Sequence, residues 1–153
     1  MIQAGDKVPE FELPDSDMNI IKSSDCSGHN FVVYFYPKDD TPGCTMEATE
    51  FTDLMSEFEQ LDTKIVGVSK DNCISHGDFR DKYGLTVRLL ADVDGKMCEA
   101  FGVWQEKEKN GVKKMGIVRS TFIIDAQGVI RQAMYNVTPK GHAQEVLELV
   151  KAL

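Results

Sequence analysis

The residues most able to do chemistry lie between Pro37 and Cys44, in the sequence Pro-Lys-Asp-Asp-Thr-Pro-Gly-Cys. Thr41 followed by Pro42 predicts the start of a helix, because a proline disfavours helical geometry in the residue before it and suits the first helical position. Cys44 would then lie in the first turn, where unpaired amides and the helix dipole stabilise an anion. That position lowers the pKa of a cysteine and predicts a reactive thiolate.

Two neighbours of Cys44 support a nucleophilic role for its sulfur. Gly43 has no side chain, so a small substrate could come close to the backbone amides. Thr41 could direct its hydroxyl toward the sulfur or toward an oxygen bound beside it. An isolated free cysteine is more often a small buried hydrophobic residue. The combination of cap, proline and glycine favours chemistry over that alternative.

Strands and helices are expected on both sides of this segment. The continuous apolar run from Phe31 to Tyr36 is typical of a strand buried on both faces, and a second such strand is expected over residues 64–69. A helix closed by Gly84 is expected over residues 74–83. The helix that carries Cys44 should continue with one apolar face, because apolar residues recur at helical spacing: Phe51, Leu54, Met55 and Phe58.

The remaining pattern completes an α/β arrangement. A short hairpin is expected around residues 14–17, and a second hairpin should join residues 121–124 to 129–131. A short strand over 88–91 and a helix from Met97 to Phe101 lie between them. The last helix is expected to start at Thr138-Pro139. This order predicts one domain over residues 1–153, with a thioredoxin-like fold, a central mixed sheet flanked by helices, and an N-terminal β-hairpin.

Composition narrows the class of protein. The chain has 153 residues, 42% of them hydrophobic, with 17 basic and 25 acidic side chains and a formal net charge of −8. Such an acidic chain would be repelled by phosphate backbones, so no nucleic-acid partner is expected. Basic residues do cluster near residues 107–114, but Glu106 and Glu108 interrupt them, which favours a solvated loop. The start of the chain lacks signal-peptide features and no run approaches a membrane span, so we expect a cytoplasmic protein without a membrane partner.

The cysteines and histidines predict neither disulfides nor a metal site. The four cysteines lack CxxC pairing, which argues against a zinc knuckle or a thioredoxin dithiol, and disulfides are rare in the cytoplasm. His29, His76 and His142 show no metal-ligand spacing. We therefore expect no metal and no cofactor.

Pro37, Thr41 and Cys44 match the PxxxTxxC motif of the peroxiredoxins, and the longer run Tyr-Pro-Lys-Asp-Asp-Thr-Pro-Gly-Cys-Thr resembles the bacterioferritin comigratory protein (PrxQ) group. Residues 116–125 resemble the arginine-containing strand of that group, and residues 137–142 resemble its segment before the last helix. The resemblance covers nearly the whole chain. It implies a thioredoxin-like fold and a thiol-dependent peroxidase.

The resemblance also implies roles for individual residues. Cys44 would be the peroxidatic nucleophile and would become a sulfenic acid. Thr41 would orient the peroxide, and Arg119 would favour the thiolate and the developing negative charge. Pro37 would shape the pocket and shield the sulfur from water. Glu47 would support Arg119 through a salt bridge.

The sequence departs from the group in the residue that would resolve the sulfenic acid. Many members carry a second cysteine five residues after the first, where this chain has Thr49, and others carry it near the position of Arg80. The remaining candidates are Cys73, Cys98 and Cys26. We favour the absence of an internal resolving cysteine, with Cys73 as the main alternative and Cys98 as a weaker one.

Three functions remain in competition. The leading one is a peroxidase that reduces hydrogen peroxide and organic hydroperoxides, with thioredoxin, glutaredoxin or a low-molecular-weight thiol as its reductant. A general thiol–disulfide oxidoreductase is disfavoured because Gly-Cys-Thr-Met lacks the second thiol of CxxC. A redox-sensing module that oxidises and signals to a partner is the third. The chain is expected to be a monomer or a weak homodimer.

Overall fold

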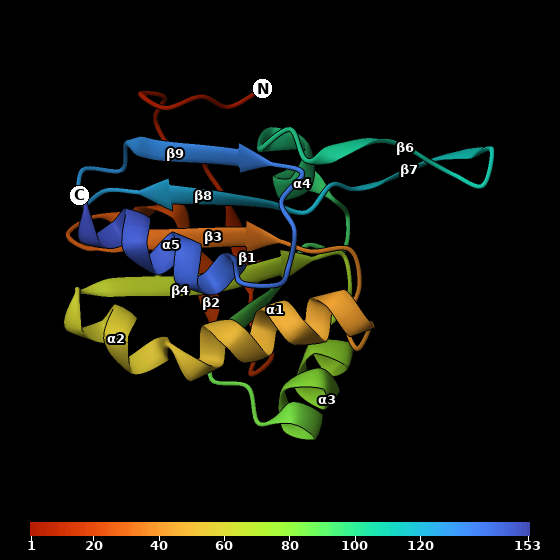
Figure 1. Cartoon of the computed structure of the whole chain (residues 1–153), viewed down its shortest axis with the longest axis horizontal. Coiled ribbons are helices and arrows are strands. Elements are labelled where there is room, and N and C mark those ends of the chain that lie inside the picture. The colour runs from red at the N-terminus through yellow and green to blue at the C-terminus, as the bar shows by residue number, and fades with distance from the viewer.

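A five-stranded mixed sheet forms the centre of the computed structural model, which describes all residues from 1 to 153. Its strands lie in the order β5-β4-β3-β8-β9 (Figure 1). They are β3 (Asn30–Phe35), β4 (Thr63–Ser69), β5 (Arg88–Ala91), β8 (Ser120–Ile124) and β9 (Ile130–Tyr135). β4 pairs with β3 and β5 in parallel, whereas β8 is antiparallel to both β3 and β9. The predicted thioredoxin-like α/β architecture is confirmed.

Helices cover both faces of this sheet. They are α1 (Pro42–Asp53), α2 (Met55–Gln60), α3 (Cys73–Tyr83), α4 (Lys96–Ala100) and α5 (His142–Lys151), with a short 3₁₀ helix η1 (Ser23–Cys26). In Figure 1, α1 and α5 lie in front of the sheet. The helices are too short, or too polar, for any of them to cross a bilayer.

Strand β3 shows how the sheet joins two hydrophobic cores. Phe31, Val33 and Phe35 point into one cluster, which also contains residues of α4 and η1. Val32 and Tyr34 point into the other, with residues of α1, α2, α3 and α5. Successive side chains of a strand alternate between faces, so a strand with a core on each side must be apolar throughout.

The N-terminal hairpin is confirmed. It consists of β1 (Glu12–Pro14) and β2 (Ile20–Lys22), paired antiparallel. The connecting turn is held by Asp15, whose Oδ1 accepts hydrogen bonds from the amides of Asp17 and Asn19, both at 2.9 Å. Aspartate is favoured in turns because its side chain can bond the backbone a few residues on.

The single helix predicted from Phe51, Leu54, Met55 and Phe58 is wrong in one respect. The chain breaks at Leu54, so that α1 ends at Asp53 and α2 begins at Met55. The amide of Leu54 is shared between the carbonyls of Glu50 and Phe51 at 3.3 and 3.2 Å, which tightens the last turn. Phe51 and Phe58 are buried as expected, whereas Leu54 and Met55 are partly exposed.

The predicted start of the last helix is also wrong. α5 begins at His142 rather than at Thr138-Pro139, because Gly141 takes a left-handed conformation with φ of 77° and forms the N-cap. Glycine adopts this conformation without steric cost. Pro139 lies in the turn before the helix, where it packs close to Gly43. Pro139 therefore contributes to packing between the loop and α1 and does not start a helix.

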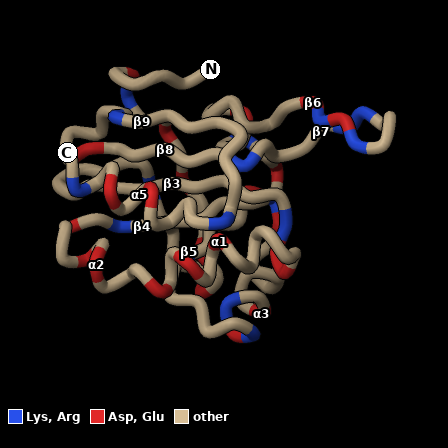
Figure 2. Tube along the Cα trace, in the orientation of Figure 1, with Lys and Arg blue, Asp and Glu red and all other residues tan.

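The basic stretch expected to be a loop is instead a β-hairpin, made of β6 (Trp104–Lys109) and β7 (Val112–Ile117). Asn110 and Gly111 form its two-residue turn, with φ of 53° and 77°, which is the preferred chemistry for such a turn. The hairpin projects from the body of the molecule, with basic and acidic residues along it (Figures 1 and 2). Its strand alternation places Lys107 and Lys114 opposite one another, on the face away from Glu106 and Glu108.

Candidate active site

The strand register brings the two ends of the candidate site together. Phe35, the last residue of β3, pairs with Ser120, the first residue of β8. Because the strands are antiparallel, Arg119 lies beside the point where the chain leaves β3 and enters the loop to α1. The start of α1 and the base of the β6–β7 hairpin lie at this same end of the sheet (Figure 1).

Cys44 occupies the first turn of α1, as the sequence predicts. Thr41 is the N-cap and Pro42 the first helical residue. The amide of Thr45 makes the first helical hydrogen bond, to the carbonyl of Thr41 at 2.8 Å, so the amides of Gly43 and Cys44 precede the helical ladder. Cys44 is only 2% exposed. Its sulfur therefore lies in a sheltered place beside the positive end of a helix.

The guanidinium of Arg119 lies against the sulfur. Its Nη2 is 3.3 Å from Cys44 Sγ, and its Nη1 is 2.7 Å from Glu47 Oε1. The side chain of Arg119 is 14% exposed and that of Glu47 is fully buried. A guanidinium at this distance from a cysteine sulfur favours a negative charge there, because it donates a charge-assisted hydrogen bond. The structure thus contains the salt bridge expected from the sequence.

Gly43 makes room for this arrangement. A Cβ atom at this position would lie 3.2 Å from Arg119 Nη2 and 3.4 Å from Pro139 Cγ. A larger side chain would therefore press on the guanidinium and on the loop before α5. The absence of a side chain at position 43 therefore lets the guanidinium of Arg119 and the ring of Pro139 lie close to the start of α1.

Glu47 has an unusual environment for a carboxylate. Burial raises the pKa of its carboxyl to about 7, with Arg119 opposing the rise. Oε1 accepts the hydrogen bond from Arg119, whereas Oε2 is buried without a hydrogen-bond partner. A neutral Glu47 leaves more of the arginine's charge directed at Cys44 than an ionised one, so the protonation of Glu47 is linked to the charge at the sulfur.

Thr41 and Pro37 lie in the loop as expected, but neither side chain makes a hydrogen bond with the sulfur. The hydroxyl of Thr41 donates to the carbonyl of Lys38 at 2.8 Å rather than to Cys44. Pro37 is exposed at the start of the loop. Among the residues that the sequence predicts for the site, Arg119 and Glu47 are the side chains that the structure links to Cys44.

The other cysteines differ from Cys44 in their surroundings. All four thiols are free. Burial raises the pKa of Cys26 to about 12. Burial raises the pKa of Cys98 further, and a hydrogen bond with the Asp92 side chain adds to this rise. Cys73 is partly exposed at the start of α3. Burial therefore makes Cys26 and Cys98 poor nucleophiles and leaves Cys73 as the accessible second thiol.

Lys107, which the sequence pattern assigned to a solvated loop, is a second cation near the site. Its Nζ donates to the carbonyl of Ile117 at 2.8 Å, two residues before Arg119. Burial lowers the pKa of Lys107, the charge of Arg119 lowers it further, and that of Cys44 opposes the change. The sequence did contain a signal for this hairpin: Glu and Lys alternate from Glu106 to Lys109, and an Asn110-Gly111 turn follows.

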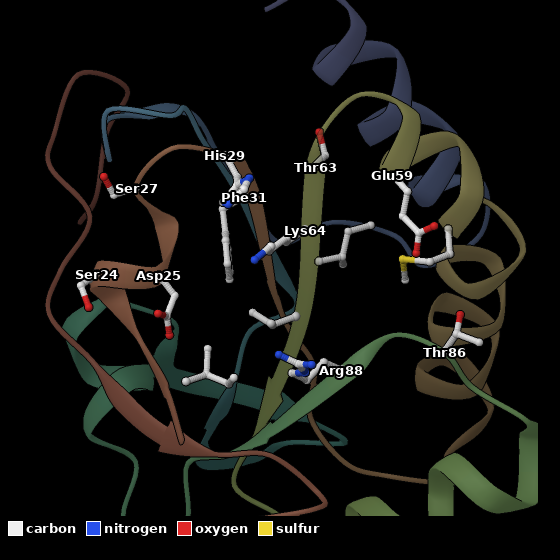
Figure 3. A pocket seen from close by; sticks show the side chains of 14 residues that line it. Ser24, Asp25, Ser27, His29, Phe31, Glu59, Thr63, Lys64, Thr86 and Arg88 are labelled. Atoms are coloured by element: carbon white, nitrogen blue, oxygen red, sulfur yellow. The ribbon is translucent and has the colours of Figure 1, made fainter. Parts of the chain in front are cut away.

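A sizeable surface pocket of the molecule lies elsewhere. It has a volume of about 630 Å³ and is lined by residues of η1, α2, β3 and β4. Figure 3 shows Lys64 and Arg88 directed into it. Cys44, Glu47 and Arg119 are not among its lining residues. The candidate active site is instead a small sheltered place at the start of α1.

Comparison with known proteins identifies the family of this chain. Residues 4–133 match the AhpC/TSA family. A putative peroxiredoxin Bcp of Helicobacter pylori is 46% identical over 147 residues, which cover 96% of this chain and 97% of the relative. Peroxiredoxin Bcp of Bacillus subtilis is 44% identical over 150 residues, covering 98% and 96%.

Solved structures show the same relationship. A PrxQ mutant of Xylella fastidiosa superposes with a TM-score of 0.94 at 39% identity, covering 99% of this chain and 97% of the other. The bacterioferritin comigratory protein of Xanthomonas campestris superposes with a TM-score of 0.89 at 41% identity, covering 93% and 90%. The chain therefore belongs to the AhpC/TSA family and, within it, to the peroxiredoxins of the bacterioferritin comigratory protein (PrxQ) group.

Proposed function

We propose that this protein is a thiol peroxidase that reduces hydrogen peroxide and organic hydroperoxides through Cys44. The observation that carries the proposal is the placement of Arg119 Nη2 at 3.3 Å from Cys44 Sγ, in the first turn of α1. A cation and a helix start together favour a thiolate at this sulfur. Cys26 and Cys98 are instead buried within the core, where burial raises the pKa of both thiols.

The first chemical step follows from this arrangement. The Cys44 thiolate attacks one peroxide oxygen in line with the O–O bond; an S–O bond forms and the O–O bond breaks. The sulfur is oxidised by two electrons to the sulfenic acid, and the second oxygen takes a proton and leaves as water or an alcohol. Arg119 donates hydrogen bonds to the charge that develops on these oxygens.

Thr41 and the helix amides would hold the peroxide in place. The amides of Gly43 and Cys44 precede the helical ladder, so both can donate to a bound oxygen. Thr41, at the N-cap, would orient the peroxide by rotating its hydroxyl away from the Lys38 carbonyl that it contacts in the free protein. Pro37 would limit the access of water to the loop. Positioning of this kind can account for a large part of a rate enhancement.

The range of peroxides is supported by a relative. The Xanthomonas campestris bacterioferritin comigratory protein has been solved as a trapped intermediate and ligand complex in connection with alkyl peroxide reduction. Its 41% identity to this chain supports organic hydroperoxides as substrates here as well.

The second half of the cycle needs an external thiol in this proposal. Thioredoxin, glutaredoxin or a low-molecular-weight thiol would attack the Cys44 sulfenic acid, form a mixed disulfide and release water; a second thiol would then regenerate Cys44. Cys73 is the internal alternative because it is partly exposed, whereas Cys98 would first have to leave the core. Such a cycle suits the reducing cytoplasm, where we expect the protein to act.

Peroxide consumption with a reductant tests this proposal against its alternatives. We expect continuous consumption of hydrogen peroxide with dithiothreitol, dependent on Cys44. A redox-sensing module would oxidise once and turn over slowly. A general thiol–disulfide oxidoreductase would instead reduce an added protein disulfide, such as that of insulin, which we expect this protein to do poorly because it has no second thiol in its helix.

A further inference from the structure

Asp39 is a buried carboxylate in the loop between β3 and α1, and its side chain is only 4% exposed. Its Oδ1 accepts a hydrogen bond from the hydroxyl of Tyr36 at 2.5 Å. Its Oδ2 lies 2.7 Å from the hydroxyl of Ser75 and 2.8 Å from Nδ1 of His76. These groups come from the end of β3 and from α3, so a single side chain ties the loop to two other elements.

The partners of His76 fix the orientation of its ring. The ring is fully buried, and its Nε2 lies 2.8 Å from the carbonyl of Leu90 in β5. A carbonyl can only accept, so Nε2 carries a hydrogen. Nδ1 faces Asp39 Oδ2 at 2.8 Å, so the buried ring joins the loop to β5 through one hydrogen bond at each nitrogen.

The backbone of Asp39 is anchored as well. Its amide donates to Asp71 Oδ2 at 2.8 Å, and the hydroxyl of Ser69, at the end of β4, donates to the same oxygen at 2.7 Å. Asp39, Asp71 and His76 lie within 4.8 Å of one another, as metal ligands would. Hydrogen bonds from the protein already occupy these carboxylate oxygens, so we interpret the cluster as an anchor for the loop rather than as a metal site.

This anchor lies directly before the reactive cysteine. The carbonyl of Lys38, the residue before Asp39, accepts a hydrogen bond from the hydroxyl of Thr41 at 2.8 Å. The carbonyl of Thr41 in turn accepts the first hydrogen bond of α1, from the amide of Thr45. A shift of the loop would therefore move Thr41, the N-cap residue whose hydroxyl would orient the peroxide. A misplacement of about 1 Å can lower a rate about a hundredfold.

We propose that Asp39 is a positioning residue of the peroxide site, which fixes the loop from Pro37 to Thr41 by binding Tyr36 and α3. This role rests on the proposed peroxidase function and concerns the same site. Asp39 does not reach the sulfur in this arrangement; it acts by holding Thr41 and the start of α1 in the geometry that receives the peroxide. It should affect the reaction with peroxide more than the intrinsic reactivity of the thiol.

The next residue offers a matched control. Asp40 also links the loop to α3, through Lys82 Nζ at 2.8 Å and the hydroxyl of Tyr83 at 2.5 Å. Its side chain is 41% exposed, however, and exposed ion pairs contribute little to stability. Asp40 has a φ of 58°, a conformation that asparagine also tolerates. Asp40→Asn therefore removes a neighbouring carboxylate without disturbing the backbone.

The experiment compares two reactions of the same sulfur. Stopped-flow single turnovers give the rate of Cys44 oxidation by hydrogen peroxide, and mass spectrometry of the Cys44 peptide gives its rate of alkylation by iodoacetamide across pH. For Asp39→Ala we expect the peroxide rate to fall about ten- to a hundredfold. Its alkylation rate should stay within about threefold of wild type, with the same pH midpoint. Asp40→Asn should match wild type in both reactions.

A conservative variant separates positioning from a general loss of structure. With its Oδ1 toward Tyr36, asparagine at position 39 can still accept from that hydroxyl, and its amide nitrogen can donate to a neutral His76 and to the hydroxyl oxygen of Ser75. Asp39→Asn should therefore recover most of the peroxide rate that Asp39→Ala loses. If Asp39→Ala fails to fold, Tyr36→Phe removes one donor and keeps the ring; we expect a loss of roughly two- to tenfold with peroxide and no change in alkylation.

Each other outcome overturns the proposal. An unchanged peroxide rate in Asp39→Ala, or in Tyr36→Phe if the alanine variant does not fold, would mean that the anchor does not position the site. Equal losses in the two reactions would assign the effect to the thiol itself. An equal loss in Asp40→Asn would assign it to charge near the loop. A wild-type protein that does not react with peroxide at Cys44 would instead overturn the proposed function, and this proposal with it.

Discussion

Arg119 donates from Nη2 to Cys44 Sγ at 3.3 Å, although 75 positions of the chain separate the two residues. The antiparallel register of β3 and β8 creates this contact, because it pairs Phe35 with Ser120 and so places the preceding arginine at the exit of β3. Glu47, one turn further along α1 than Cys44, holds the other side of the guanidinium at 2.7 Å. The Cys44 sulfur, the Arg119 guanidinium and the Glu47 carboxylate that binds this guanidinium thus lie together at one end of the sheet.

Replacement of Arg119 should slow the reaction with peroxide. Removal of one donor to developing charge costs about a hundred- to a thousandfold in well-studied sites, and we expect a loss in this range for Arg119→Ala. The pH at which Cys44 becomes reactive should rise, because a nearby cation favours the thiolate. Stopped-flow rates against pH measure both effects. Arg119→Lys keeps the positive charge but loses the two parallel donors of the guanidinium, so it should restore the pH midpoint of the reaction better than its rate. An unchanged pH profile in Arg119→Ala would show that the arginine does not have this role.

The buried carboxylate should make stability depend on pH. Burial raises the pKa of Glu47 to about 7 in the folded protein, from an ordinary value of 4.5. Between these values the folded state binds more protons than the unfolded state, so this residue makes the free energy of unfolding fall as pH rises from 4.5 to about 7 and then level off. The slope cannot exceed about 1.4 kcal/mol per pH unit for one group.

Urea unfolding of wild type and Glu47→Gln at a series of pH values isolates this contribution. His142 has a lowered pKa because of burial and contributes with the opposite sign, so the difference between the two proteins is the informative quantity. We expect the stability of wild type relative to Glu47→Gln to decrease from pH 5 to pH 7. A difference that stays constant with pH would contradict the assignment.

Thr41→Val should slow oxidation of Cys44 by removing the hydroxyl that would orient the peroxide. The same change removes the hydrogen bond to the Lys38 carbonyl, so Thr41→Ser, which keeps the hydroxyl, is the appropriate control. We expect a loss of about ten- to a hundredfold for valine and little loss for serine in stopped-flow measurements. Equal rates in wild type and Thr41→Val would show that the helix amides suffice to hold the peroxide.

The local features of the site could be predicted from the sequence. Thr41-Pro42 gave the start of α1, and therefore the position of Cys44 in its first turn, because capping depends on neighbouring residues alone. The contact of Arg119 with Cys44 depends on the pairing of distant strands, which spacing along the chain does not encode; only the family resemblance pointed to this arginine. The cluster of Asp39 and His76 was missed for the same reason.

The errors in the predicted elements have physical causes. The hairpin β6–β7 is exposed on both faces over most of its length, so it lacks the apolar alternation by which strands are usually found. Its Asn110-Gly111 turn was the remaining signal. Thr138-Pro139 resembled a helix start, but Pro139 packs beside Gly43 and the helix begins after Gly141 instead. Packing between elements outweighed a correct local preference in this case.

Resolution of the sulfenic acid should not require Cys73. We expect Cys73→Ser to retain peroxide turnover with an external thiol such as dithiothreitol, and Cys98→Ser to behave alike as the buried control. Peptide mapping of the oxidised wild-type protein under non-reducing conditions should find Cys44 as a sulfenic acid, an overoxidised form or a mixed disulfide with added thiol. A stoichiometric bond between Cys44 and Cys73 would instead establish an internal resolving cysteine.

The central claim is that Cys44 is the peroxidatic nucleophile. One equivalent of hydrogen peroxide, followed by a sulfenic-acid trap and mass spectrometry of the peptides, tests it most directly. We predict that the trap labels Cys44 in wild type, that Cys44→Ser consumes no peroxide while remaining folded, and that Cys26→Ser and Cys98→Ser react as wild type does. Labelling of another cysteine, or wild-type peroxide consumption by Cys44→Ser, would contradict the account.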